Sequence, residues 1–206
     1  IPLVPGLTLI AAEHEPRRGD YEPIVTIANV SSDVVSTVVT ANLPEGDRLQ
    51  VDRVVRREDL QQARTFYSWY QHGDPPIFEG ATSFSMSAAI LNDLKTKGQT
   101  EIVRMGSDRN PLTAMVSLLA GTGGATIRHP GTLRRVEPHA VAFPVLLNDQ
   151  PAVLHAIHAR GTFDDATIDF HVLDDPDNPV LLRLAGGSTG RIVRIAFPMP
   201  NAAPLE

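Results

Sequence analysis

Five runs of alternating apolar and polar residues occupy the last third of the chain, and each run ends in a cluster of turn-forming residues. Alternation with a period of two sends successive side chains to opposite faces, as in a half-buried strand, and clusters of Asp, Asn, Gly and Pro interrupt strands. We therefore expect an antiparallel β-meander, and its sequence contains no recognisable catalytic motif. The runs are residues 140–148, 152–163, 166–173, 180–184 and 190–198.

The first 56 residues also predict strands. Residues 23–30 and 34–40 are rich in Val, Ile and Thr, which favour strands, and they flank a hairpin turn at 31–33. Residues 49–55 alternate again after a turn at 44–47. Two β-rich segments therefore enclose a middle section of different character.

Two or three helices are expected in that middle section, at about residues 57–121. Residues 58–70 place their apolar side chains along one helical stripe. Residues 87–97 begin with an N-cap residue, Ser87, and are followed by Gly98, where a left-handed C-cap is needed. A third, short helix is expected at residues 111–121.

The fold class that follows is α+β: mainly antiparallel β, as a bent sheet, half-barrel or sandwich, with two or three helices packed on one face. We interpret residues 1–206 as a single β-rich domain, long enough to bury a sizeable core. The chain does not begin with Met, and its last three residues resemble a cloning scar. We therefore expect it to be cut from a longer protein.

Composition excludes several classes of function. The chain has no Cys, which excludes disulfides, thiolate metal sites and a Cys nucleophile. Its formal net charge is −6, which argues against nucleic acid as the main partner. The longest apolar run, at 112–120, is about half of the ~20 residues that a membrane-spanning helix needs, so no transmembrane segment is expected.

Three patterns resemble ligand sites but are interpreted as structural. His155 and His158 are three residues apart, which in a strand sends them to opposite faces, so they are not expected to share a metal ion. The acidic run at 174–177 lacks the Gly and the distant Glu of a calcium loop and predicts an Asx-type turn. The Gly-rich segment at 121–124 lacks the Lys and the flanking elements of a phosphate loop. We expect no metal ion and no cofactor.

Four of the eleven aromatic residues cluster at Phe66, Tyr67, Trp69 and Tyr70. In the expected helix, Phe66 and Tyr70 share a face and the other two flank it. This helix either packs against the sheet or lines a groove that holds an apolar or glycan ligand. These four residues are the candidate ligand-binding residues, and no catalytic residue is identified.

Seven segments of the chain are similar to a known family. They read LRRVEP at 133–138, FPVLLN at 143–148, HARG at 158–161, LDDPDNP at 173–179 and IVRIAFP at 192–198, with VVRREDL at 54–60 and AILNDLK at 89–95 upstream. In these segments the chain resembles a recurrent, uncharacterised bacterial envelope module that can precede an OmpA-like peptidoglycan-binding domain. The resemblance implies a secreted or periplasmic protein, directed by a leader that has been removed, with another domain following. It carries over no catalytic residues.

Three functional hypotheses follow. The first is a non-catalytic spacer or interaction module of the cell envelope. The second is a module that binds a lipid, lipoprotein or glycan in an apolar groove beside the aromatic cluster, and the third is an enzyme whose acid/base site is assembled only by folding. The spacer predicts an interior filled by Leu, Phe and Trp69, whereas the binding module predicts an open apolar pocket lined by the same residues.

Overall fold

The computed structural model describes residues 1–16, 19–67, 70, 75–107, 126–163 and 166–198. Within these residues the chain forms fourteen strands, all in one sheet, and two helices. In chain order the elements are β1 (Thr8–Glu15), β2 (Gly19–Tyr21), β3 (Ile24–Val30), β4 (Val34–Asn42), β5 (Arg48–Arg56), α1 (Arg57–Gln62), β6 (Thr65–Tyr67), β7 (Ala81–Thr82), α2 (Ala88–Thr96), β8 (Gln99–Ser107), β9 (Thr126–Arg135), β10 (Val141–Leu147), β11 (Gln150–Phe163), β12 (Ala166–Leu173), β13 (Leu181–Ala185) and β14 (Thr189–Ala196).

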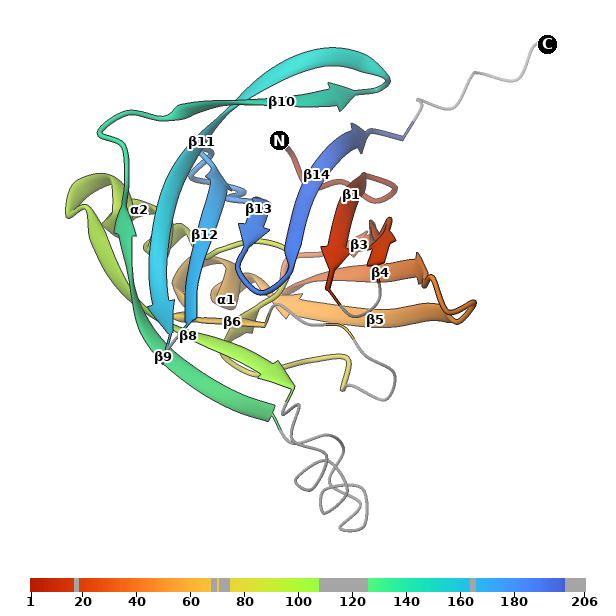
Figure 1. Ribbon diagram of the computed structural model, residues 1–206, viewed down its shortest axis with the longest axis horizontal. Coiled ribbons are helices and arrows are strands. Elements are labelled where there is room, and N and C mark those ends of the chain that lie inside the picture. Colours follow the sequence, from red (N-terminus) through yellow and green to blue (C-terminus); the bar gives the residue numbers. More distant parts are fainter. Residues whose placement is uncertain (17–18, 68–69, 71–74, 108–125, 164–165, 199–206) are drawn as a thin grey trace.

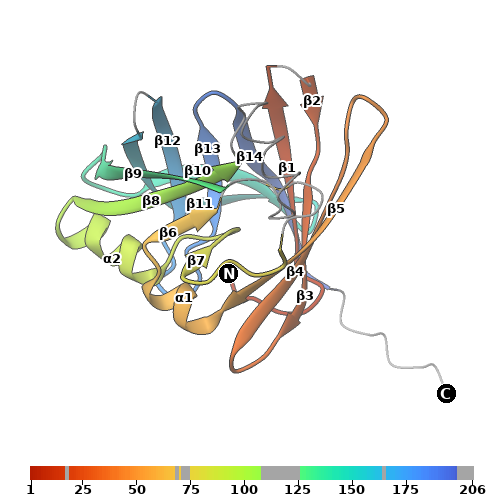
Figure 2. The same cartoon turned by 90° about the horizontal axis from the view of Figure 1, so that it is seen from below.

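The sheet curls so that its two ends approach each other. Its strand order is β5-β4-β3-β1-β14-β13-β12-β11-β9-β8-β6-β7, with β2 beside β1. Pairing of β1 with β14 brings the first and last strands of the chain side by side (Figure 1). At the ends of the path, Val54 of β5 forms a bridge with Ile77, a few residues before β7. Helix α2 lies alongside β8, at the opposite end of the molecule from the β4–β5 hairpin (Figure 2).

The meander expected at residues 140–198 is confirmed, because β10 to β14 are each antiparallel to the next strand. The meander also closes on itself. Its first strand, β10, runs parallel to its last strand, β14, with Leu146 opposite Arg194 and Leu147 opposite Ile195. The five strands therefore form a closed ring, which we call the five-stranded ring.

The expected fold class, α+β with two or three helices packed on one face of a bent sheet, half-barrel or sandwich, is wrong. The described residues are mostly strand, arranged as a closed ring that further strands extend, and the two helices have only six and nine residues. The alternating pattern reports the local conformation of each strand and the face on which it is buried. It does not specify that β10 and β14 meet, because this contact joins segments far apart in the chain.

The helix expected at residues 58–70 is also wrong beyond its first turns. Helix α1 ends at Gln62, and Ala63 has an extended ψ of 140°. Residues 65–67 instead form β6, which runs parallel to both β7 and β8. The apolar residues of this segment fit a helical stripe, but a Thr-Phe-Tyr sequence also favours a strand, and pairing with two other strands decides the outcome. The helix expected at 111–121 lies outside the described residues.

Helix α2 confirms the prediction for residues 87–97. The Ser87 side chain accepts a hydrogen bond from the Ile90 amide at 3.2 Å, and Gly98 has a φ of +71° just after the helix. Asp93 anchors the helix to Arg64, just before β6, at 2.6 Å, and it also pairs with Lys97 at the end of the same helix at 2.8 Å. Hydrogen bonds from these two cations lower the pKa of Asp93 to about 2.

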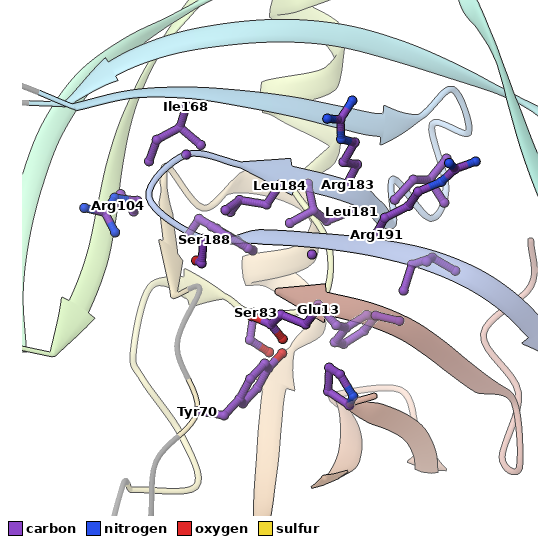
Figure 3. A pocket seen from close by; sticks show the side chains of 18 of the residues that line it. Glu13, Tyr70, Ser83, Arg104, Ile168, Leu181, Arg183, Leu184, Ser188 and Arg191 are labelled. Atoms are coloured by element: carbon purple, nitrogen blue, oxygen red, sulfur yellow. The ribbon is translucent and has the colours of Figure 1, made fainter. Parts of the chain in front are cut away.

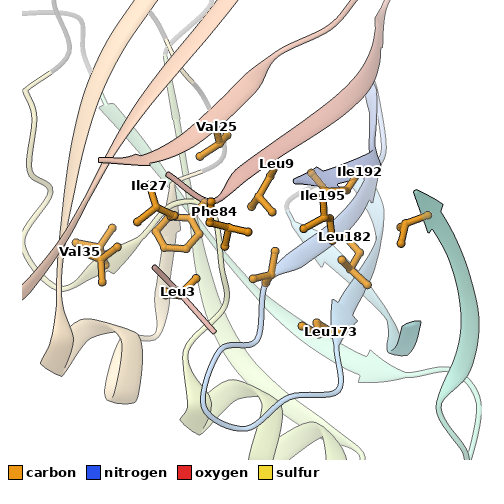
Figure 4. Close-up of a cluster of buried hydrophobic side chains, with 14 of the residues drawn as sticks. Leu3, Leu9, Val25, Ile27, Val35, Phe84, Leu173, Leu182, Ile192 and Ile195 are labelled. Atoms are coloured by element: carbon orange, nitrogen blue, oxygen red, sulfur yellow. The ribbon is translucent and has the colours of Figure 1, made fainter. Parts of the chain in front are cut away.

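Two large apolar clusters make up most of the core. The larger cluster joins β1, β3 and β4 to the five-stranded ring (Figure 4). The second packs the apolar face of α2 against β11 and β12, with Phe163 and Phe170 tilted against each other at 6.0 Å. The curled sheet also encloses a space, beside these two clusters, that side chains do not fill.

Candidate functional site

A cavity of about 480 Å³ lies inside the curled sheet. One wall comes from β1 and from β12 to β14, and the facing wall comes from β6, β8, β9 and residues 83–84. Figure 3 shows the space between these walls. Most of the lining is apolar, including Leu9, Ala11, Val25, Phe66, Ile168 and Leu184.

A small polar group interrupts this apolar lining. Tyr70, Ser83 and Glu13 lie close together on one side of the cavity, whereas Arg104 of β8 lines another part of it, toward Ile168 (Figure 3). Ser83 is only 5% exposed. Its hydroxyl oxygen has no hydrogen bond of ordinary geometry within the described residues, although the Tyr70 hydroxyl points toward it. A buried hydroxyl without a partner is costly, and a bound ligand could satisfy it.

The Tyr70 hydroxyl stays protonated over the physiological pH range. Burial raises the pKa of Tyr70 to about 12 and outweighs the opposing influence of the Arg53 guanidinium and the Ser83 hydroxyl. A neutral phenol can both donate and accept a hydrogen bond. The polar side of the cavity therefore presents a donor and acceptor pair rather than a phenolate.

The structure does not bring the four predicted site residues together at one site. Phe66 and Tyr70 line the cavity. Tyr67 is 1% exposed and points elsewhere, where its ring stacks on Phe78 with centroids 4.1 Å apart. Phe66 and Tyr67 separate because neighbouring side chains of a strand point to opposite faces. Trp69 lies outside the described residues.

A buried arginine fixes the aromatic residues beside the cavity. Arg53 is 1% exposed, and its guanidinium carbon lies 5.0 Å from the ring centres of Tyr67 and Phe78 and 5.5 Å from that of Tyr70. Its Nη1 donates a hydrogen bond to the Pro75 carbonyl at 2.8 Å. Such cation–π contacts are strongest where water is excluded, so Arg53 holds Tyr70 in its place on the cavity wall.

A histidine pair lies elsewhere in the structure. The rings of His158 and His171 stack at 4.4 Å, since the two residues are directly opposite in β11 and β12. His158 Nδ1 lies 3.0 Å from both carboxylate oxygens of Glu137, and its Nε2 lies 3.0 Å from Asp169 Oδ1. The Asp169 oxygen also accepts a hydrogen bond from Arg160 at 2.9 Å.

Spacing along the sequence did not predict this pair, because the histidines other than His155 and His158, including His171, are scattered and show no ligand spacing. His155 is exposed and lies opposite Ala142 of β10, away from the pair. The pairing register of the two strands nevertheless follows from the sequence. If a hairpin turns at residues 164–165, residues equally far from the turn lie opposite each other, which pairs residue 158 with residue 171. A prediction of hairpin register would have found the histidine pair.

The histidine pair predicts a loss of stability in mild acid. Burial, together with the nearby His158 and Arg183, lowers the pKa of His171 to about 4 and outweighs the opposing effect of Glu137 and Asp169. The unfolded chain binds this proton near pH 6.5. Between pH 6.5 and pH 4 the unfolded state therefore binds more protons than the folded state, and stability falls as the pH falls.

We expect the free energy of unfolding to fall by about 2 kcal/mol from this group between pH 7 and pH 4.5, a figure reduced because the ring is partly exposed. Urea titrations at the two pH values measure the change. His171→Gln removes this dependence, whereas His155→Gln, an exposed control on the neighbouring strand, retains it. Equal pH dependence in the two variants would show that His171 is not the group responsible.

The acidic run at 174–177 forms the expected Asx-type turn. Asp175 Oδ1 accepts hydrogen bonds from the backbone amides of Asp177 at 3.1 Å and Asn178 at 3.3 Å. Asp174 pairs with Lys95 of α2. In the described part of the chain, no three His, Asp or Glu side chains are placed to hold a metal ion. No helix among the described residues is long and apolar enough to cross a membrane.

Comparison of the chain with protein-family models, with curated proteins and with solved structures found no match.

Proposed function

We propose that the protein is a binding module that holds an amphipathic molecule, its apolar chain inside the cavity and its polar end beside Tyr70 and Ser83. The observation that carries the proposal is the cavity itself. Its volume of about 480 Å³ falls within the range of small-molecule sites, and its lining is mostly apolar with a few polar groups. A spacer would have no need of such a space, because unfilled apolar volume costs stability.

The lining supports an acyl chain better than a glycan. A glycan presents many hydroxyl groups, each of which loses its water on entry and needs a protein partner. The wall formed by β1 and by β12 to β14 offers mainly aliphatic side chains instead, including Leu9, Ile168 and Leu184. An apolar chain fits this wall, and the hydroxyl of Ser83 can hydrogen-bond to an uncharged ester group at the polar end.

The resemblance to the bacterial envelope module supports the bacterial envelope as the source of the ligand. An envelope protein of the periplasm would meet the acyl chains of lipids and lipoproteins. We therefore propose that such a chain is the natural ligand, carried by a module that is joined to an anchoring domain in the full-length protein. Fractionation of the producing bacterium would test the location, since recovery in the cytoplasm contradicts it.

The cavity is tested by filling it. Ala11 of β1 lines the cavity, whereas its neighbour Ala12 is exposed and points to the other face of the strand. We expect Ala11→Trp to lower the affinity for a dansyl-labelled fatty acid at least roughly tenfold, because the indole occupies space that the chain needs. Ala12→Trp is the matched control and should bind as the unmodified protein does.

Fluorescence titration of the probe measures both affinities, and circular dichroism checks that each variant is folded. Strong binding to the unmodified protein and to Ala12→Trp, with loss in Ala11→Trp, is the expected result. Equal binding by the two variants would place the probe outside the cavity. Absence of binding to the unmodified protein would contradict the proposed function.

A further inference from the structure

Four ionisable side chains form a continuous row across four neighbouring strands. His158 of β11 lies opposite His171 of β12, which lies opposite Arg183 of β13, which lies opposite Arg191 of β14. We call these four residues the cationic row. Directly opposite side chains of an antiparallel pair share a face of the sheet, so the four groups point the same way.

The cationic row faces the inside of the five-stranded ring. Phe143 of β10 lies across the ring from β12, and its ring centre is 5.8 Å from that of His171. The guanidinium carbon of Arg191 lies 5.0 Å from the centre of the Phe143 side-chain ring, and Arg191 Nη2 donates a hydrogen bond to the Pro144 carbonyl at 3.0 Å. In Figure 3 the side chains of Arg183 and Arg191 point away from Tyr70 and Ser83. The row is therefore distinct from the polar side of the cavity.

The charges of the row are not balanced within the described residues. Like charges directly opposite in a sheet are destabilising, yet Arg183 and Arg191 are opposite each other. The nearby carboxylates of Glu137 and Asp169 bind the other end of the row, at His158, and Asp169 is shared with Arg160. In the described part of the chain neither Arg183 nor Arg191 forms an ion pair with a carboxylate.

Two ring and guanidinium nitrogens of the row are buried without a partner. Arg191 Nε and His171 Nδ1 are both inaccessible to solvent, and neither makes a hydrogen bond within the described residues. A buried donor of a charged group without an acceptor is costly. The unpaired Nε and the opposed arginines are independent observations, and both point to an anion between the arginines.

We propose that the cationic row is a binding site for a phosphate group, held by the guanidinium groups of Arg183 and Arg191 inside the five-stranded ring. Planar guanidinium groups match the oxygens of a phosphate and bind it through paired, charge-assisted hydrogen bonds. A phosphate dianion neutralises the two opposed arginines and offers acceptors to their N–H groups. Arg183 and Arg191 also border the cavity, but their side chains point away from its polar side (Figure 3). A titration with phosphate alone therefore tests this site whether or not the cavity holds an acyl chain.

The test compares Arg183→Gln with Arg194→Gln. Arg194 is an exposed control on β14 that pairs with Asp149 at 3.3 Å, outside the row. Inorganic phosphate is titrated into each protein against sodium chloride at matched ionic strength, and the melting temperature is followed. We expect phosphate to raise the melting temperature of the unmodified protein and of Arg194→Gln. In Arg183→Gln the affinity should fall at least roughly tenfold, the loss expected for a charge-assisted contact.

The pKa of His171, measured by proton NMR, provides a second readout. A variant that only changes the stability of the protein would leave this pKa unchanged. A phosphate beside His171 favours its protonated form, so phosphate should raise the pKa of His171 from about 4 in the unmodified protein. If Arg183→Gln does not fold, Arg183→Lys replaces it. This variant retains the positive charge but loses the paired N–H donors of the planar guanidinium, so it should bind phosphate more weakly than the unmodified protein does. An unchanged His171 titration, or equal phosphate affinity in the Arg183 and Arg194 variants, would overturn the proposal.

Free phosphate and a phosphorylated head group share this chemistry, and a second titration distinguishes them. Glycerol phosphate replaces inorganic phosphate under the same conditions. Tighter binding of inorganic phosphate identifies the free ion as the ligand, whereas tighter binding of the monoester identifies a head group. Failure of both to bind contradicts the site.

Discussion

Replacement of Arg53 by Ala is expected to lower the free energy of unfolding by about 3 kcal/mol. The side chain is 1% exposed and fills the space between the rings of Tyr67, Tyr70 and Phe78. Its loss leaves a void among these rings and removes the donor that satisfies the Pro75 carbonyl. Removal of the buried charge recovers some desolvation energy, but this gain does not offset the void.

Two further variants separate the causes of this loss. Arg48→Ala removes an exposed arginine from the same strand, β5, and should change stability by less than about 0.5 kcal/mol. Arg53→Met fills most of the volume without the charge, and should be more stable than Arg53→Ala. Urea denaturation measures all three. An Arg53→Ala variant as stable as Arg48→Ala would mean that the aromatic residues pack without the guanidinium.

Gly131→Ala is expected to destabilise the protein by about 3 kcal/mol, the upper end of the usual range for overpacking. A Cβ at this position would lie 2.4 Å from the Thr162 carbonyl oxygen and 2.7 Å from the Phe163 ring. Gly131 lies directly opposite Phe163 in β9 and β11, so the aromatic ring covers the bare backbone of the glycine. Because the nearer atom belongs to the backbone, a rotamer change cannot relieve the clash.

Gly187→Ala is the matched control for that substitution. A Cβ there meets nothing within 4 Å, and the backbone does not require a positive φ. We expect this variant to be as stable as the unmodified protein or slightly more stable, because Ala restricts the unfolded chain. Thermal unfolding followed by circular dichroism compares the two. Equal melting temperatures for Gly131→Ala and Gly187→Ala would show that β9 and β11 shift apart without cost.

The strands of the fold were predictable because their information is local. The alternation in residues 140–198 and the β-branched segments before residue 56 gave the correct element type, as did the capping residues of α2. The ring closure was not predictable in this way, because the pairing of β10 with β14 depends on how five strands curl together. The error at 58–70 has a related cause, since β6 is selected by two partner strands and its own residues are compatible with a helix.

The candidate site was predictable only in part. Phe66 and Tyr70 reach the cavity, but as a strand residue and a residue beyond the strand rather than as one face of a helix. The opposite wall comes from β1 and β12 to β14, whose apolar residues look in sequence like ordinary core. Ser83 carries no motif, and its role follows from burial that only the folded chain creates.

Native mass spectrometry of freshly purified protein tests the central claim most directly. If the cavity holds an acyl chain, the unmodified protein and Ala12→Trp should carry an added mass that organic solvent removes and that tandem fragmentation identifies as a lipid. Ala11→Trp should appear at the mass of the chain alone. A bare mass for the unmodified protein, together with no uptake of the dansyl-labelled fatty acid, would contradict the account.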